Sequence, residues 1–254
     1  MTGRIARLAT GAMATAGLAF GLAGGALGAS TSPRPGELAP ITEPYTPKID
    51  PANFVARADN RYFPLGPGAA WHFTGLVDGT RQTDDAVVLT RTKRILGVRA
   101  TVVRDTVSEH GHAIELTFDY YAQDRQGNVW YMGEDAFDRV HGRFVKASDS
   151  WLGGVSSGKP GIIMPAHPQV GDAYRQEYYP PGKALDTARV IGLNGKLTVR
   201  YGSFRHLLVT SDYSPADPQT EHKYYAPGVG EIAERVVKGG HEAFQLVRLK
   251  RAAP

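Results

Sequence analysis

The sequence predicts an all-β protein in which two pseudo-repeated antiparallel meanders form one barrel-like or sandwich core, with a short N-terminal helix. Three observations support this prediction. Glycine and proline are plentiful, with 30 and 17 residues among 254, and no long segment is rich in helix-forming residues. Apolar and polar residues alternate with a period of two along several segments, as they do in half-buried strands. A set of turn glycines and aromatic residues recurs in order after about 100 residues.

The first 29 residues have the layout of an export signal. Arg4 and Arg7 precede an apolar run rich in glycine and alanine, and small residues stand at positions 26, 28 and 29, where a signal peptidase would cut. This pattern predicts a signal peptide over residues 1–29, the general secretory route, and a secreted or envelope-associated protein without a membrane span. An uncleaved anchor is the alternative, because the run of about 22 residues is long enough to cross a bilayer.

Residues 30–48 are predicted to form a disordered linker, because they are rich in Pro, Ser and Thr and have little apolar surface to bury. A single β-rich domain is expected over residues 49–254, with halves of about 49–150 and 151–254. The chain has no cysteine, so this domain is free of disulfides, and thiol catalysis and thiolate metal sites are excluded. A formal net charge of +4 from dispersed basic residues argues against a nucleic-acid partner.

The folded body is expected to begin with a short helix of one or two turns. Asp50 is suited to the N-cap and Pro51 to the first helical position. Antiparallel strands come next, joined by tight turns that glycine and neighbouring polar residues mark. These turns are expected at Leu96–Gly97, His110–Gly111, residues 124–128 and His141–Gly142.

The segment AIELTFDYYA, residues 113–122, alternates most regularly and is typical of a half-buried strand. One face would carry Ile114, Leu116, Phe118 and Tyr120, and the other face Glu115, Thr117 and Asp119. A second acidic group follows it, formed by Glu134, Asp135 and Asp138. Its spacing does not fit a calcium-binding loop, so we expect a solvated turn there, and neither a metal nor a cofactor is predicted.

An internal repeat is the most informative pattern in the chain. The matched positions are Tyr120–Ala122 with Tyr224–Ala226, Gly127 with Gly230, Val129 with Ile232, and Trp71 with Tyr174. Ordered matches of turn glycines and core aromatics favour a duplication, although such patterns also arise by chance in β-rich chains.

The segment GGVSSGKP, Gly153–Pro160, nearly matches a phosphate-binding loop. It meets seven positions of the motif, but Pro160 stands where a serine or threonine must bind magnesium. The glycine and prolines that follow also exclude the helix that such a loop requires. We therefore expect a flexible connection between the two halves, or a lid over a cavity in which Trp151 and Lys159 contact a ligand.

Aromatic doublets provide the other candidates for ligand contact. Neighbouring residues of a strand face opposite ways, so one member of each doublet should be buried and the other exposed. Tyr121, Trp130 and Tyr225 are the candidates, since exposed aromatic rings bind glycans and apolar groups. The alternative is that these rings only cover the outer face of a sheet.

No catalytic motif stands in its required context. Residues 154–158, GVSSG, fit the letters of G-x-S-x-G, but Ser156 and Ser157 are not on a strand-to-helix elbow, and His110 and His112 are better explained by a hairpin tip than by a metal site. A hydrolase site assembled from dispersed residues, with His167, His222 and nearby carboxylates, is the alternative to a binding function.

Long stretches of the chain resemble an uncharacterised group of secreted proteins that is common in actinobacteria. The resemblance covers about residues 49–249 and includes RYFPLGPG, YYAQDRQGNVWYMGED, KPGIIMPA and YYAPGVGE. It implies export and assigns no catalytic residue. At Asn60-Arg61 the chain departs from an expected Asn-Pro, which affects one local turn. The segment YYAPGVG is also similar to periplasmic and lipoprotein half-barrel folds that carry lipid.

Together these features favour a secreted or cell-envelope, non-enzymatic β-rich binding module. The expected partner is an apolar or glycan-like ligand, such as a lipid or a cell-wall glycan, and the oligomeric state is left open. The alternatives are the secreted hydrolase and a structural surface component without a ligand.

Overall fold

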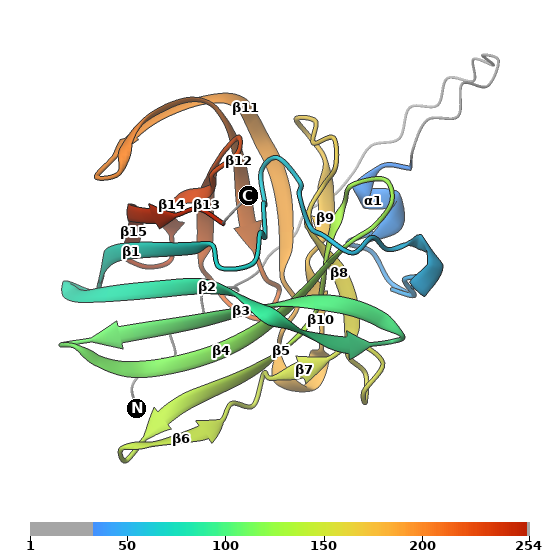
Figure 1. The fold of residues 1–254 in the computed structure, drawn as a ribbon, viewed down its shortest axis with the longest axis horizontal. Coiled ribbons are helices and arrows are strands. Elements are labelled where there is room, and N and C mark those ends of the chain that lie inside the picture. The colour runs from blue at the N-terminus through green and yellow to red at the C-terminus, as the bar shows by residue number, and fades with distance from the viewer. Residues whose placement is uncertain (1–32, 253–254) are drawn as a thin grey trace.

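The computed structural model describes residues 33–252 and is all-β (Figure 1). The signal-peptide prediction for residues 1–29 lies outside the described residues. Fifteen strands form one antiparallel sheet, and the helices are limited to α1 (Pro35–Leu38) and two 3-10 turns, Pro51–Asn53 and Pro180–Gly182. The strands are β1 (Ala70–Val77), β2 (Thr80–Ile95), β3 (Val98–Glu109), β4 (His112–Gln123), β5 (Val129–Val140), β6 (Arg143–Lys146), β7 (Trp151–Leu152), β8 (Lys159–Met164), β9 (Ala173–Arg175), β10 (Glu177–Tyr178), β11 (Thr187–Val199), β12 (Gly202–Tyr213), β13 (Thr220–Ala226), β14 (Gly230–Lys238) and β15 (Glu242–Lys250).

The predicted hairpin tips are confirmed. Both residues of the turns at Leu96–Gly97, His110–Gly111 and His141–Gly142 have positive φ angles, between 49° and 82°. Two such residues in a row give the backbone twist that joins neighbouring antiparallel strands most directly. The helix predicted after Asp50 is present as a single 3-10 turn. Asp50 accepts a hydrogen bond from the Ala52 amide at 2.9 Å, but the helix ends at Asn53.

The two meanders follow one another in the sheet in the same order. The strands of the first half lie as β5-β4-β3-β2-β1, with β8 on the far side of β5, and those of the second half continue as β15-β14-β13-β12-β11-β9. The halves are joined where β1 pairs with β15 (Figure 1). The two-meander prediction for the fold is therefore confirmed.

The strand registers define which residues of the two halves are equivalent. In the first half Asp119 lies opposite Glu134, and the register shifts between Tyr120 and Tyr121. In the second half Lys223 lies opposite Glu234, and the register shifts at the matching place, between Tyr224 and Tyr225.

This register equates Met132 with Ile232, because Gly133 and Ala233 lie opposite the first tyrosine of each repeat. The predicted match of Val129 with Ile232 is therefore wrong by three residues. The turn that follows the second tyrosine pair is shorter than the turn that follows the first. The residues beyond it are therefore fewer positions away from the tyrosines in the sequence.

The sheet closes on itself through one short segment. Its two ends, β9 and β10, are successive parts of residues 173–178. β9 pairs with β11, while β10 pairs with β8, so this segment links the second half back to the first. Gly161 in β8 lies so close to it that a Cβ atom there would stand 2.4 Å from the Gln176 backbone. The core is therefore barrel-like rather than a sandwich of separate sheets.

The prediction of a disordered linker over residues 30–48 is wrong for residues 33–48, which the structure describes as an ordered strap on the closing segment. Ala39 and Tyr45 are fully buried. The Tyr45 hydroxyl donates to the Pro160 carbonyl, and the Tyr45 carbonyl accepts from Lys159 Nζ at 2.6 Å. The backbone amide of Arg175 donates to the Ala39 carbonyl at 2.8 Å. The segment has no core of its own, and it is ordered because it completes the core of the body.

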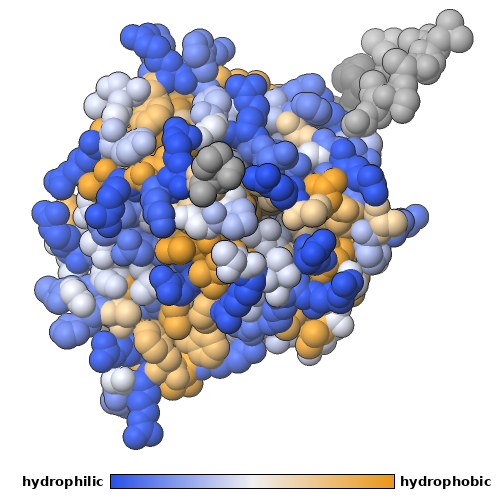
Figure 2. All heavy atoms as spheres, viewed as in Figure 1, coloured by the Kyte–Doolittle hydropathy of each residue, from blue (hydrophilic) through white to orange (hydrophobic). Residues whose placement is uncertain are grey.

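The face of the molecule seen in Figure 2 is mostly hydrophilic, with smaller hydrophobic areas between the hydrophilic side chains. Among residues 33–252, no helix is both long and apolar enough to cross a bilayer.

Candidate functional site

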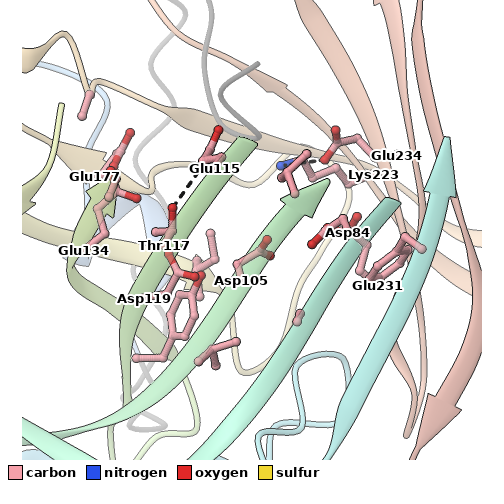
Figure 3. A pocket seen from close by; sticks show the side chains of 18 of the residues that line it. Asp84, Asp105, Glu115, Thr117, Asp119, Glu134, Glu177, Lys223, Glu231 and Glu234 are labelled. Carbon is pink, nitrogen blue, oxygen red and sulfur yellow. Dashed lines mark hydrogen bonds and ion pairs between the residues drawn. The ribbon is translucent and has the colours of Figure 1, made fainter. Parts of the chain in front are cut away.

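A cavity of about 400 Å³ lies inside the closed sheet, between the two meanders. This volume is within the range of pockets that hold small ligands. Inward-facing side chains from both halves line the cavity, and Figure 3 shows acidic groups from several strands converging on it.

The lining is strongly acidic. Of the described residues that line the cavity, eleven are acidic and two are lysines, and none is a histidine or an arginine. The acidic residues are Asp84, Asp105, Glu115, Asp119, Glu134, Asp149, Glu177, Asp217, Glu231, Glu234 and Glu242, and the lysines are Lys183 and Lys223. A cavity with so many carboxylates attracts positive charge and groups that donate hydrogen bonds.

Apolar side chains form another part of the same lining. Phe63, Trp71, Phe73, Tyr121 and Tyr225 all contribute to it. The Tyr121 ring meets Phe63 edge-on with centroids 5.1 Å apart, which fixes its position. The cavity can therefore contact an apolar body and a polar group of one ligand.

The alternation of β4 brings its acidic residues inward. Glu115, Thr117, Asp119 and Tyr121 lie on one face of the strand and line the cavity (Figure 3). The sequence predicted the two faces correctly. It did not indicate that the acidic face would be the one enclosed.

The expectation of a solvated acidic turn at Glu134 and Asp135 is wrong. Both residues lie within β5, where successive side chains face opposite sides of the sheet. Glu134 is buried and lines the cavity. Asp135 is on the outer face, where its carboxylate accepts from Lys93 at 2.6 Å and from Lys146 at 3.2 Å.

Asp119 and Glu134 form a pair in the first half, which we call the first-half acid pair. The Tyr131 hydroxyl lies 2.7 Å from Asp119 Oδ1 and 3.0 Å from Glu134 Oε2. A hydroxyl has one proton, so Tyr131 donates to only one of these carboxyl groups at a time. The other group needs a proton or another donor.

The pKa values of this pair are raised. Burial, and then the charge of Asp105, raise the pKa of Asp119 to about 7. Burial, followed by the charges of Glu177 and Asp119, raises the pKa of Glu134 well above its usual range. Glu177 lies beside Glu134 (Figure 3), and burial and then Asp186 raise its pKa in the same direction. Each of these groups therefore binds a proton more tightly than an exposed carboxyl group does.

In the second half, a buried lysine lies among the acidic residues and offsets their repulsion. The Lys223 ammonium is buried and lies 3.3 Å from Glu234 Oε2, 3.7 Å from Glu221 Oε2 and 3.9 Å from Asp212 Oδ2. Burial lowers the pKa of Lys223, but the charges of Glu234, Glu221 and Asp212 outweigh it and raise that pKa well above its usual value. The charged form of Lys223 is therefore favoured more strongly than that of an exposed lysine.

Two of the five predicted ligand-contacting residues line the cavity, Tyr121 and Tyr225. Trp151 is buried behind the lining, and its indole N–H donates to Glu177 Oε2 at 2.8 Å. Trp130 is buried too and donates to Asp124 Oδ2 at 2.9 Å. Lys159 binds the strap instead.

The loop from Gly153 to Gly158 is a turn between β7 and β8 rather than a lid. The Gly154 amide donates to the Gly158 carbonyl at 2.9 Å, which closes the turn on itself. Neither Trp151 nor Lys159 is among the described residues that line the cavity.

The expected division of each aromatic doublet into a buried and an exposed ring is wrong at Tyr120 and Tyr121, which are both buried. Tyr120 is on the outer face, but the Lys93 ammonium covers its ring at 4.2 Å, and its hydroxyl donates to Asp135 at 2.6 Å. The charged side chains of neighbouring strands thus hide an outward ring.

The histidines proposed for a hydrolase are not at the cavity. His167 is exposed in the loop after β8. His222 lies between Glu221 and Lys223 in β13, so it faces the opposite side of the sheet. Within residues 33–252, no group of three or more metal-ligating side chains is arranged to hold a metal ion.

The sequence did not predict the acidic residues of the cavity as a site. The signal that identifies them is the internal repeat, because aligning the tyrosine pairs places Asp119 over Lys223 and Glu134 over Glu234. The first half has an acid where the second half has a lysine, and both positions are buried. Charge therefore distinguishes these positions from the rest of the repeat.

No protein-family model matches the sequence, and no curated protein matches it. Two solved structures are similar in fold. One, from Bacteroides fragilis, is described as an exported protein with a YmcC-like fold; it has 12% identity and a TM-score of 0.46, over 76% of this chain and 100% of that chain. The other is described as a lipoprotein from Parabacteroides distasonis, with 16% identity and a TM-score of 0.37, over 75% of this chain and 99% of that chain. Both similarities are too distant to bear on the site.

Proposed function

We propose that this protein is an exported, non-enzymatic binding module that holds a small ligand in the cavity of its closed sheet. The observation that carries the proposal is the convergence of aromatic and acidic side chains from both halves on a cavity of about 400 Å³. The export signal predicted over residues 1–29 supports a location outside the cytoplasm.

The acidic lining narrows the range of ligands. A purely apolar ligand would leave buried carboxyl groups without hydrogen-bond donors, which is costly, and a fatty acid would bring a further negative charge. A ligand with several donor groups, such as a glycan or an amine, satisfies the carboxyl groups. Tyr121, Trp71 and their neighbours would contact its less polar faces.

A hydrolase that uses the first-half acid pair is the second candidate. Asp119, with its pKa raised to about 7, has the acidity of a general acid or base at neutral pH. Hydrolysis of chromogenic glycosides or esters that is lost in Glu134→Gln would favour this candidate over binding alone.

The binding function is tested by exposing the purified protein to glycan, amine and lipid fractions of bacterial envelopes and measuring the retained mass by native mass spectrometry. Thr117 is buried on the cavity face of β4, so Thr117→Phe should fill the cavity and abolish retention. Thr106→Phe adds the same volume on β3 outside the cavity and serves as the matched control. Retention by neither the wild type nor the control, or equal retention by all three proteins, would contradict the proposal.

A further inference from the structure

We propose that the tip of the β5–β6 hairpin, residues 139–146, docks this protein on the surface of an anionic lipid bilayer. We call these residues the basic tip. The inference goes beyond the proposed function, because the basic tip does not line the cavity and its role does not depend on what the cavity binds.

The basic tip projects from the body of the protein. β6 pairs with β5 and with no other strand among residues 33–252, and it lies at the lower edge of the molecule (Figure 1). Every residue from Arg139 to Lys146 is exposed. Because no third strand continues the sheet here, both faces of this two-stranded tip are open to a partner.

Exposed apolar side chains gather on the basic tip. Ten large apolar side chains are exposed among residues 33–252, and three of them are Val140, Phe144 and Val145, at 45%, 43% and 51%. The strand register places Val140 and Val145 on one face of the tip and Phe144 on the other. Isolated exposed apolar residues are ordinary, whereas a group of them is typical of a surface that binds another apolar body.

The same residues carry a positive charge. The sequence of the basic tip, RVHGRFVK, contains three cations, Arg139, Arg143 and Lys146, and no acid. Lys146 forms an ion pair with Asp135 at 3.2 Å, whereas neither arginine is paired with a carboxyl group of the residues that the structure describes. Anionic lipid head groups attract such cations when these lie within a Debye length of the membrane surface.

The outer face of the sheet continues this surface. Phe137 lies opposite Lys146, and the half-buried Phe118 is on the same face in the neighbouring strand β4. Two further arginines lie there. Arg91 covers the Phe118 ring at 4.9 Å, and the exposed Arg104 lies opposite Phe118 in β3. The basic tip is therefore the end of a longer face that combines aromatic rings with arginines.

A bilayer is the partner that fits this combination. A nucleic acid or another anionic polymer attracts the cations but gives no apolar contact to the valine side chains. A stable interface with a folded protein takes about 20–30 residues on each side, many more than the basic tip offers. A bilayer has its head groups directly above its acyl chains, so apolar side chains that enter by about 5–10 Å bring neighbouring cations to the head groups.

Vesicle flotation tests the proposal. The protein is expressed with its own export signal and purified in the exported form. Vesicles of phosphatidylcholine with about 30% phosphatidylglycerol should bind at least about tenfold more protein, in about 100 mM NaCl, than vesicles of phosphatidylcholine alone. Raising the NaCl concentration to about 500 mM should release most of the bound protein, because salt screens the attraction.

Two matched pairs of variants locate the contact. Val145→Asp and Arg143→Glu should each lower binding to the phosphatidylglycerol vesicles at least about tenfold. Val237 in β14 is also 51% exposed, and Lys238 is an exposed cation beside it. Val237→Asp and Lys238→Glu therefore make the same changes of charge in the other half of the chain, and they should leave binding within about twofold of the wild type. Circular dichroism checks the fold of each variant, and if one variant of the basic tip does not fold, the other decides.

Insertion into the bilayer has its own readout. The chain has no cysteine, so a single introduced cysteine carries an environment-sensitive fluorophore at one chosen place. On Val145→Cys the fluorophore should shift to the blue and brighten when phosphatidylglycerol vesicles are added, because it leaves water for an apolar environment. On Val237→Cys its spectrum should not change.

Each outcome supports or overturns the proposal. Equal binding to the two kinds of vesicle, binding to neither, or equal losses in the variants of the basic tip and their controls would overturn it. Binding to phosphatidylglycerol vesicles without a spectral change on Val145→Cys would mean that another surface docks, and would overturn it too. Complete release from the vesicles by polyphosphate at equal charge would favour an anionic polymer and likewise overturn it. Ligand retention in the cavity is measured separately, so the proposed function stands or fails independently.

Discussion

At the scale of single residues, buried acids outnumber buried cations among residues 33–252. Asp119, Glu134 and Glu177 are buried close to one another, and burial with mutual repulsion raises the pKa of each. A group with a raised pKa binds a proton more tightly in the folded protein than in the unfolded chain. Its contribution to stability is complete at low pH and declines as the pH rises through the folded-state pKa.

Asp119 gives the first prediction. Its pKa rises from 3.8 to about 7 on folding, so the free energy of unfolding should fall as the pH rises from about 4 to about 7. The full effect of this single group is about 4 kcal/mol, from roughly 1.4 kcal/mol for each pKa unit. Urea unfolding at pH 4.5, 6 and 7.5 measures it. In Asp119→Asn the fall should be smaller by a similar amount; an unchanged pH dependence would show that Asp119 does not titrate in this range.

The equivalent acids Glu134 and Glu234 give the second prediction, because they have opposite partners. Glu134→Gln replaces a group whose raised pKa favours its neutral form with a neutral amide of the same shape, so stability at pH 7 should change by less than about 1 kcal/mol. Glu234→Gln removes the nearest partner of the buried Lys223, 3.3 Å away, and should cost about 1–3 kcal/mol. Thermal unfolding of both variants measures these changes in stability. Equal losses of stability in the two variants would contradict the assigned difference between the halves.

At the scale of strands, β4 shows what the sequence could and could not predict. Alternation identified the strand, its ends and the members of its two faces. It did not tell which face is enclosed, because that depends on how a sheet of fifteen strands closes. The usual expectation that apolar residues face inward fails here, since Phe118 and Tyr120 are shielded on the outer face by Arg91 and Lys93.

Strand closure is the subject of the third prediction. A Cβ atom at Gly161 would lie 2.4 Å from backbone atoms of Gln176, so Gly161→Ala must separate β8 from the closing segment. Overpacking of this kind typically costs about 1–3 kcal/mol, and more where backbone must move. Gly192 in β11 is the control, because the nearest atoms to a Cβ atom there are 3.9 Å away. A loss of stability in Gly161→Ala no larger than in Gly192→Ala would mean that the closing contact is not tight.

At the scale of the whole molecule, the repeat indicated two halves, but nothing in it indicated the closing segment or the strap. Pro-rich residues 33–48 have the composition of a linker, and only the long-range contacts of Tyr45 and Ala39 with the body explain their order. Composition describes what a segment can bury by itself and does not describe the surface that a distant part of the chain offers to it.

The strap supplies the fourth prediction. Tyr45 is fully buried and its hydroxyl donates to the Pro160 carbonyl, so Tyr45→Ala should lower the free energy of unfolding by about 3–5 kcal/mol. Tyr201, which is 38% exposed, is the matched control, and Tyr201→Ala should cost less than about 1 kcal/mol. Chemical denaturation measures both. Similar small losses in the two variants would show that residues 33–48 are dispensable for folding.

The pairing of Lys223 with Glu234 gives the molecule an internal standard. The side-chain carboxyl carbon of Glu234 has a magnetic resonance signal that reports an acid in contact with an ammonium ion, within the same fold and solvent as Glu134. When an amine is titrated into the labelled protein, the Glu134 resonance can be compared with the Glu234 resonance of the free protein. Convergence on that value would show that the amine contacts the Glu134 carboxyl group.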